Sequence, residues 1–272
     1  MIRRSLASDV LLFTQHEHAL LSGRLAERID GRLIARPSPR TVEGISLHDC
    51  GWPLHDDHPT LNPHGQPLHV FETPVRLSTQ VWTASAQRAA AKDRYAGLLV
   101  SLHVLNLSGL AAQSHQAAHE TFEINKFQHQ QIELQEQLRH ALGLRIDRPL
   151  NRGLARPGTS PAEDALRFDY HLLRAMDQLS LALLCAEDLF ASLEGIDSRP
   201  GGTPLSIRLQ RLGPFRFRLN PWPFDDAILN FAVPGRRIPA RTFHQTEDFR
   251  NTYENAPIDE FGVVAETSFE LL

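Results

Sequence analysis

Residues 38–52 read SPRTVEGISLHDCGW and combine a helix start, an apolar face and a histidine next to an aspartate. Ser38 is suited to cap a helix, because its hydroxyl can accept a hydrogen bond from a backbone amide of the first turn. Pro39 fits the first helical position, where its fixed φ is favourable and no amide proton is needed. We expect a helix that continues through the His-Asp pair and ends at Gly51.

His48 and Asp49 lie on one face of this expected helix. At about 100° per residue they flank the direction of Ile45, roughly 60° to one side and 40° to the other. Both side chains can therefore reach one point in front of that face. A pair at a helix end can also serve only as a cap, but the shared direction favours two ligands of one metal ion.

A second histidine is placed by the helix that we predict over residues 15–30. Its apolar stripe consists of Leu21, Leu25 and Ile29. His18 falls on that stripe and is expected to point inward, whereas His16, roughly 200° away, is expected to point outward. A core histidine is commonly bonded to a backbone carbonyl, so only the joint pattern makes His18 a candidate ligand.

The candidate carboxylate Asp177 lies on a long predicted helix. This helix starts at the capping pattern SPAE of residues 160–163 and is expected to reach residue 193, with Gly195 as its stop. Its inward face is predicted to consist of Leu166, Tyr170, Leu173, Asp177, Ser180 and Leu184. An inward-facing carboxylate such as Asp177 is costly unless it has a partner. That partner is either a metal ion or a charged neighbour such as Arg174 or His171.

His103 lies on a helix predicted over residues 94–110 that is apolar almost all round. A hydrogen-bonded core histidine is the default in such a helix, and a metal ligand is the alternative. Residues 96–112 form the longest mostly apolar stretch, but it is at the short edge for spanning a bilayer and contains His103 and Asn106. We therefore expect a buried helix and not a membrane span.

The composition is that of an ordinary globular protein, with 42% hydrophobic and 22% charged residues and a formal net charge of −4. This charge argues against a general nucleic-acid surface. Two cysteines favour a reducing compartment, and the apolar run at residues 10–13 is too short for a signal peptide. We expect a soluble cytoplasmic protein without a membrane or nucleic-acid partner. The 14 histidines are the unusual feature and direct attention to a metal site.

Mixed imidazole and carboxylate ligands suit a divalent metal ion. Mn, Fe, Co, Ni, Zn and Mg all accept such ligands, and the residue types do not choose among them. With an open coordination position, the ion would produce hydroxide near neutral pH and polarise a phosphoryl oxygen. The candidate ligands are His18, His48, Asp49, His103 and Asp177.

The order of His18, then SLHDCGW at residues 46–52, then Asp177 in AMDQLSLALL resembles the H…HD…D pattern of HD-domain metal-dependent phosphohydrolases. This resemblance implies an HD-like helical core in which His18, His48, Asp49 and Asp177 hold the metal. Nearly the whole chain is also similar to an uncharacterised bacterial family, through TQHEHALLSG, LHDCGW, YAGLLVSLH, MDQLSL and a PWPF segment. That second resemblance implies a shared fold and no particular activity.

The HD resemblance also gives His103 a role, because it corresponds to an extra histidine of two-metal members. Asp49 and His103 are accordingly the candidate catalytic residues. Those members have one more isolated histidine, for which this chain offers only His115, His119 or His129. A site with one metal ion and a site with two metal ions are therefore both alternatives.

The remaining segments predict further helices and a small β section. Helices are expected over residues 78–92 and 117–142, and a short strand or two within residues 1–13. Apolar residues alternate toward the C-terminus, as in strands. We expect an α+β fold with an HD-like helical metal-binding domain over residues 1–195 and a small antiparallel β appendage over residues 196–272 that packs on it.

Residues 52–75 are rich in proline, histidine and aspartate and are expected to form a long loop. Its histidines are expected at the surface: His55, His58, His64 and His69. Asp56 or Asp57 could contact the site, since the loop follows the His-Asp pair directly. Trp52 is expected to anchor the loop by packing.

The preferred function is a metal-dependent hydrolase that acts on a small phosphorylated molecule or nucleotide through metal-activated hydroxide. Arg24 and Arg36 are candidates for holding the phosphate. One alternative is an HD-type di-iron oxygenase, which requires a second metal. Another is a non-catalytic ligand-binding protein on the same fold. The oligomeric state is not indicated by the sequence.

Overall fold

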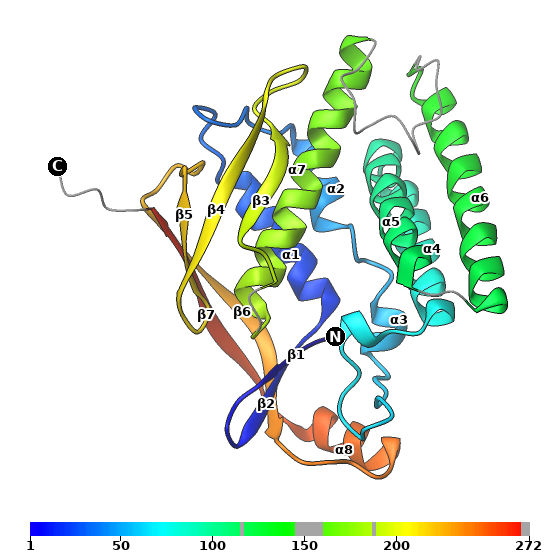
Figure 1. The fold of residues 1–272 in the computed structure, drawn as a ribbon, viewed down its shortest axis with the longest axis vertical. Coiled ribbons are helices and arrows are strands. Elements are labelled where there is room, and N and C mark those ends of the chain that lie inside the picture. Colours follow the sequence, from blue (N-terminus) through cyan, green and yellow to red (C-terminus); the bar gives the residue numbers. More distant parts are fainter. Residues whose placement is uncertain (115–116, 145–159, 187–188, 268–272) are drawn as a thin grey trace.

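A seven-stranded curled sheet forms one side of the molecule, in the order β1-β2-β6-β7-β5-β4-β3 (Figure 1). Its strands are β1 (Ile2–Ser5), β2 (Asp9–Phe13), β3 (Ser192–Asp197), β4 (Pro204–Gly213), β5 (Arg216–Asn220), β6 (Ile228–Pro239) and β7 (Ile258–Thr267). Neighbouring strands are antiparallel, except that β5 and β7 are parallel. This computed structural model describes residues 1–114, 117–144, 160–186 and 189–267.

The sheet shows that the predicted fold class is wrong. A mostly helical HD-like bundle with a small C-terminal antiparallel β section was expected, but the structure is an α+β fold with 50% helix and 23% strand. The N-terminal hairpin belongs to the same sheet, because β2 pairs with β6 and places Leu11 opposite Arg237. Local periodicity can suggest each strand, but it cannot show a pairing between such distant segments. The division at residue 195 stays a prediction.

Helices α1 to α7 lie on the other side of the molecule, whereas α8 lies at the lower end of the sheet, next to β6 (Figure 1). The helices are α1 (Gln15–Glu27), α2 (Pro39–Ser46), α3 (Pro53–Asp56), α4 (Val75–Lys92), α5 (Arg94–Ser114), α6 (Ala118–Ala141), α7 (Pro161–Leu184) and α8 (Thr246–Asn255), with a 3₁₀ turn η1 (Val70–Glu72). Helices α1 and α7 pack on each other and contact strands of the sheet; α2 and α5 pack behind them, and α4 and α6 lie farther out. The helices that meet in this inner layer supply the candidate site.

The predicted helix starts are confirmed by their caps. The Ser38 hydroxyl accepts a hydrogen bond from the Thr41 amide at 3.2 Å, with Pro39 at the start of α2. The Ser160 hydroxyl accepts one from the Glu163 amide at 3.3 Å at the start of α7. These hydroxyls satisfy amides that have no partner within the first turn.

Two predicted helix ends are wrong. Helix α2 ends at Ser46, so the His-Asp pair lies in the turns that follow it and not on the helix. Helix α7 ends at Leu184, and Gly195 is not its stop. Gly195 instead adopts a φ of 69° within β3, where the register with β4 shifts between Leu193 and Ile196. A left-handed glycine serves a β-bulge as readily as a helix end, which explains the error.

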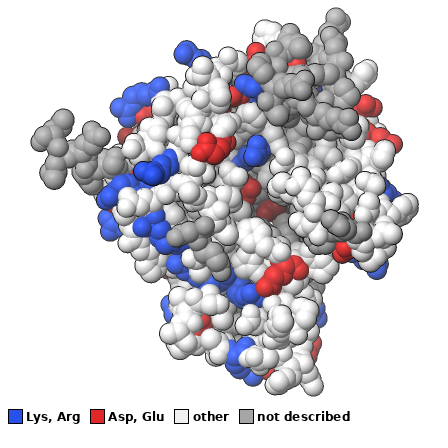
Figure 2. All heavy atoms as spheres, viewed as in Figure 1, with Lys and Arg blue, Asp and Glu red and all other residues white. Residues whose placement is uncertain are grey.

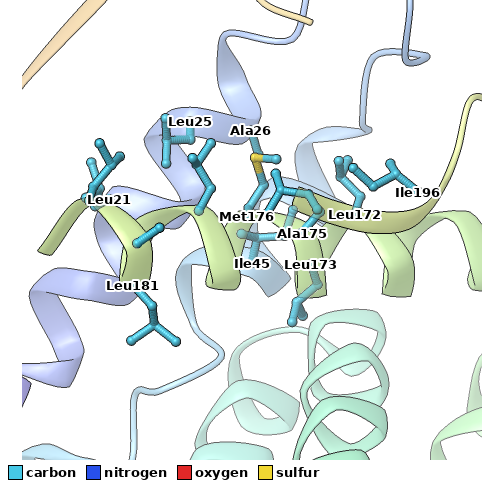
Figure 3. Close-up of a cluster of buried hydrophobic side chains, with 14 of the residues drawn as sticks. Leu21, Leu25, Ala26, Ile45, Leu172, Leu173, Ala175, Met176, Leu181 and Ile196 are labelled. Carbon is cyan, nitrogen blue, oxygen red and sulfur yellow. The ribbon is translucent and has the colours of Figure 1, made fainter. Parts of the chain in front are cut away.

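A hydrophobic core joins the helices that present the site. Leu21 and Leu25 of α1, Ile45 of α2 and Met176 of α7 are each completely buried. Figure 3 shows these side chains where α1, α2 and α7 meet. Their burial removes apolar surface from water and fixes the spacing of α1, α2 and α7.

Helix α5 is the one described helix long and apolar enough to cross a membrane, by length and composition. In the structure, 61% of its most apolar window is buried within the protein. This burial is typical of the core helix of a soluble protein. The cytoplasmic location stays a prediction.

Candidate metal centre

The five predicted ligands come together where α1, α2, α5 and α7 meet. His18 lies on α1, His103 on α5 and Asp177 on α7, while His48 and Asp49 lie in the turn after α2. The histidine side chains are at most 3% exposed and that of Asp49 is 7% exposed. Asp177 is the most accessible of the five, with 13% of its side chain exposed, so the cluster is reached by solvent along Asp177.

The ligand atoms converge within a few ångströms. The Nε2 atoms of His18 and His48 are 3.2 Å apart. Asp177 Oδ1 lies 3.0 Å from His18 Nε2 and 3.6 Å from His48 Nε2, and Asp49 Oδ2 lies 3.6 Å from His48 Nε2. Two sets of three ligand atoms, each within 4.8 Å of one another, can be drawn: His18 with His48 and Asp49, and His48 with His103 and Asp177.

The orientation of His48 is fixed by its own turn. Its Nδ1 donates to the carbonyl of Ile45 at 2.8 Å, because a carbonyl can only accept. The next turn is attached to α4, where the Gly51 amide donates to the Ser85 hydroxyl at 2.9 Å and Arg88 donates to the Cys50 carbonyl at 2.8 Å. With Nδ1 protonated, the neutral ring presents its Nε2 lone pair to the centre.

The orientation of His18 is fixed by two serines. The Ser22 hydroxyl donates to the carbonyl of His18 at 3.0 Å, and it lies 2.7 Å from the Ser180 hydroxyl, which lies 2.6 Å from His18 Nδ1. The Ser180 hydroxyl also lies 3.0 Å from the Asp177 carbonyl, which can only accept. Whether the one Ser180 proton goes to this carbonyl or to Ser22, the most contacts are made when His18 Nδ1 donates to Ser180. We therefore assign His18 the same tautomer as His48, with its Nε2 lone pair facing the centre.

Two imidazole lone pairs and two carboxylates converge on one point, and their combined negative potential favours a cation there. A donor to a carbonyl or hydroxyl on the far nitrogen is the usual support of a metal-ligating histidine. In the metal-free site a proton takes this place: burial opposes a charged ring, but Asp49 and Asp177 raise the pKa of His48 to about 9. Although burial opposes its charge too, the contacts with His18 and His48, together with the charge of the protonated His48 ring, hold the pKa of Asp177 well below its ordinary value. The donor set therefore fits a divalent metal ion.

His103 differs from the other two histidines. Its Nε2 lies 3.7 Å from Asp177 Oδ2, but its buried Nδ1 has no hydrogen-bond partner in the described part of the chain. Burial lowers its pKa to about 3, with Asp177 partly offsetting this, so the ring is neutral. Without a group that orients its far nitrogen, His103 is less suited to a permanent ligand. As a neutral ring with one donor and one acceptor, it is more suited to a hydrogen bond with a bound molecule.

Neither of the charged neighbours suggested as alternative partners, His171 and Arg174, forms an ion pair with Asp177 in the described part of the chain. His171 Nδ1 lies 3.3 Å from Asp197, which also accepts a hydrogen bond from Arg167 at 2.8 Å. Within the described ranges no ion pair links Asp177 to Arg174. The carboxylate of Asp177 is therefore surrounded by three imidazoles.

Several other predicted residues do not reach the centre. Asp56 is buried, but it accepts hydrogen bonds from the Met1 amine at 3.1 Å and the Gln15 amide at 2.7 Å. Arg24 donates to the Ala232 carbonyl and Arg36 to the Asp30 carbonyl, so the candidate phosphate ligands are placed elsewhere. His119 and His129 are exposed on α6, and His115 lies outside the described residues.

The segment 52–75 contains α3 and η1 and is not entirely a loop. His55 and His69 are buried, contrary to expectation, whereas His58 and His64 are exposed. Trp52 is buried and packs edge-on against His55, which confirms its role as a packing anchor.

Ser22 and Ser180 are the functional residues that sequence reasoning missed. The predicted face of α7 includes Ser180, but a serine on an apolar face is no sign of histidine support by itself. The available signal was spacing: Ser22 follows His18 by four residues and Ser180 follows Asp177 by three, so each shares a helix face with a ligand.

A family of proteins described as "Protein of unknown function (DUF3891)" matches residues 1–240. The chain belongs to this family. No curated protein and no solved structure matches the chain. Membership in the family confirms the resemblance to an uncharacterised family, and the match covers all five residues of the centre. The family's description names no HD-domain relationship, which stays a prediction.

Proposed function

We propose that the protein binds one divalent metal ion and hydrolyses a small phosphorylated molecule at that ion. The observation that supports this most is the pair of oriented imidazoles, His18 and His48, whose lone pairs converge at 3.2 Å between Asp49 and Asp177. Such a set of two histidines and two carboxylates suits Mn, Fe, Co, Ni, Zn or Mg. It also agrees with the HD-like pattern of the sequence.

One ion is favoured over two because the two possible ligand sets share His48. One nitrogen lone pair forms one coordinate bond, and the described residues offer no further set of three ligands. A di-iron oxygenase needs a second complete set, so the ligand count favours hydrolysis over oxygen chemistry.

When bound, a divalent ion supplies a Lewis acid that polarises a phosphoryl oxygen and makes water a nucleophile near neutral pH. The residues of the chain contribute the surroundings. Asp49 and Asp177 balance the charge of the ion, Ser180 holds His18 in the ligating tautomer, and neutral His103 is placed to form a hydrogen bond with a bound molecule beside Asp177.

The proposal is tested by metal analysis followed by an activity panel. The protein is stripped with a chelator, each of the six ions is titrated in turn, and bound metal is measured by elemental analysis. We expect about one equivalent of at least one ion, lost in Asp177→Asn and in His48→Ala. His64→Ala, which changes an exposed histidine of the segment 52–75, is the matched control and should keep the metal.

The metal-loaded protein is then assayed with phosphomonoesters, phosphodiesters and nucleotides. Turnover that depends on the ion supports the proposal. Failure to bind any of the six ions contradicts it. Metal binding without turnover of any ester contradicts the hydrolase and favours a ligand-binding protein, and two irons per chain favour the oxygenase.

A further inference from the structure

Arg174 lies on α7, one helical turn before Asp177, and is half-buried. Residues three apart are neighbours on one face of a helix, with Cβ atoms roughly 5–6 Å apart. Arg174 therefore lies beside the most exposed ligand of the centre. Its positive charge also contributes to lowering the pKa of His103, so the guanidinium lies within electrostatic range of that ring.

The N–H donors of the Arg174 guanidinium are not used within the described part of the chain. Its carbon atom lies 5.9 Å from the centre of the Tyr170 ring, one turn farther along the same face. Among the residues that the structure describes, no hydrogen bond or ion pair to this guanidinium is found. A flat aromatic ring can support a guanidinium without using any of its five N–H donors, so those donors are available to a bound molecule.

The charge at the opening points to an anion. The carboxylates of Asp49 and Asp177 together balance a divalent ion, and the imidazoles of an occupied centre are neutral. Arg174 then supplies the net positive charge next to the centre. Figure 2 shows a hollow in this face of the molecule, with acidic atoms at its bottom and Lys or Arg atoms at its edge.

We propose that Arg174 positions the substrate by binding a phosphoryl oxygen at the mouth of the His18–His48–Asp49–Asp177 centre. This inference rests on the proposed function and assigns the phosphate-binding role to a residue other than Arg24 or Arg36. A guanidinium binds two oxygens of one phosphoryl group through parallel N–H donors. The substrate class is accordingly an anionic phosphoryl compound that contacts both the ion and Arg174.

The test measures binding of inorganic phosphate to the metal-loaded protein by calorimetry. Arg174→Met is expected to raise the phosphate Kd about tenfold or more, as for loss of a charge-assisted hydrogen bond, while metal content stays unchanged. Arg174→Lys should restore part of the affinity, because it keeps the charge but not the paired donors. Arg94→Met, at an exposed arginine at the start of α5, should match the wild type.

In the activity assay, Arg174→Met should raise KM by more than it lowers kcat. If the wild type binds metal and phosphate and Arg174→Met binds phosphate within about twofold of it, Arg174 only packs on Tyr170 and the inference is wrong. A metal-loaded wild type that does not bind phosphate contradicts the inference too. Failure of the wild type to bind metal is a different result, since it overturns the proposed function itself.

Discussion

The Nδ1 atom of His18 lies 2.6 Å from the hydroxyl oxygen of Ser180, so a residue of α7 sets the tautomer of a residue of α1. Ser22 completes the arrangement by bonding both to Ser180 and to the His18 carbonyl. The rest of the centre depends on this contact, because His18 Nε2 can accept a metal only while Nδ1 keeps its proton. Groups that orient a ligand in this way affect metal affinity without touching the metal.

Ser180→Ala is expected to weaken metal binding by about 10- to 100-fold, the usual effect of removing such a support. The fold should be retained, since the change removes one oxygen from a buried site. Competition with a chelating dye measures the affinity. Ser108→Ala, which removes a buried hydroxyl on α5, is the control, and equal affinities for the two variants would show that Ser180 does not orient His18.

His103→Gln is expected to separate metal binding from turnover. Because His103 lacks support at Nδ1, the variant should keep at least half of the wild-type metal content but lose most of its kcat, on the order of 100-fold for a displaced hydrogen-bond donor. Asp177→Asn should lose the metal instead. Elemental analysis and initial rates on the same samples distinguish the two, and loss of metal in His103→Gln would make it a ligand.

Asp169 is expected to make the stability of the protein depend on pH. Burial raises its pKa to about 6, although hydrogen bonds from Tyr95, at 2.5 Å, and Thr41 lower it. The folded state therefore binds a proton that the unfolded state has already lost. This contribution to stability is complete below pH 4 and disappears as pH rises through 6, a change of roughly 3 kcal/mol in the free energy of unfolding.

Asp169→Asn removes this titration and keeps an oxygen that accepts from Tyr95. The wild-type free energy of unfolding minus that of the variant should fall by roughly 3 kcal/mol between pH 4 and pH 7, as measured by urea unfolding. Tyr95→Phe removes a hydrogen bond that lowers the pKa, so it should move the transition to higher pH. A difference that stays constant over this range would show that Asp169 titrates normally.

Gly51→Ala is expected to disturb the turn that holds Asp49. A Cβ atom at this position would lie 2.2 Å from the Val81 carbonyl oxygen and 2.5 Å from the Ser85 nitrogen, both backbone atoms of α4. The substitution should cost on the order of 1–3 kcal/mol of unfolding free energy and weaken metal binding as well. Chemical denaturation of the metal-free protein separates the first effect from the second.

The control for Gly51 is Gly109→Ala on α5, where a Cβ would meet nothing within 4 Å. Alanine favours a helix over glycine by up to about 1 kcal/mol, so this variant should be as stable as the wild type or more so. If both alanine variants behave alike, the close approach of the turn to α4 has no energetic effect.

Much of the centre could be predicted because its residues follow local helical spacing. His18 was placed inward by its stripe, and the same period selected Asp177. His48 and Asp49 were predicted to point the same way although α2 ends before them, because the turns that follow α2 continue to direct both side chains toward α1. His103 was predicted as a core residue or a ligand, and its position at the centre was a matter of tertiary packing that no local pattern reports.

The sheet was predicted poorly for a related physical reason. Alternation identifies a strand, but the partner of that strand is set by contacts that can be distant in sequence. The strand at Val10 was expected, whereas its pairing with β6 was not. Strand β3 was predicted as the end of a helix, because residues 192–197 alone do not distinguish a bulged strand from a capped helix end.

The pairing of β2 with β6 has a consequence for how the protein folds. Strand β2 leads through Thr14 directly into the helix that presents His18, yet its partner is synthesised more than 200 residues later. A ribosome releases every histidine and aspartate of the centre before it releases β6. Long-range strand pairing is slow to form, so we expect capture of the ion to be a late event in biogenesis, timed by strands that supply none of its ligands.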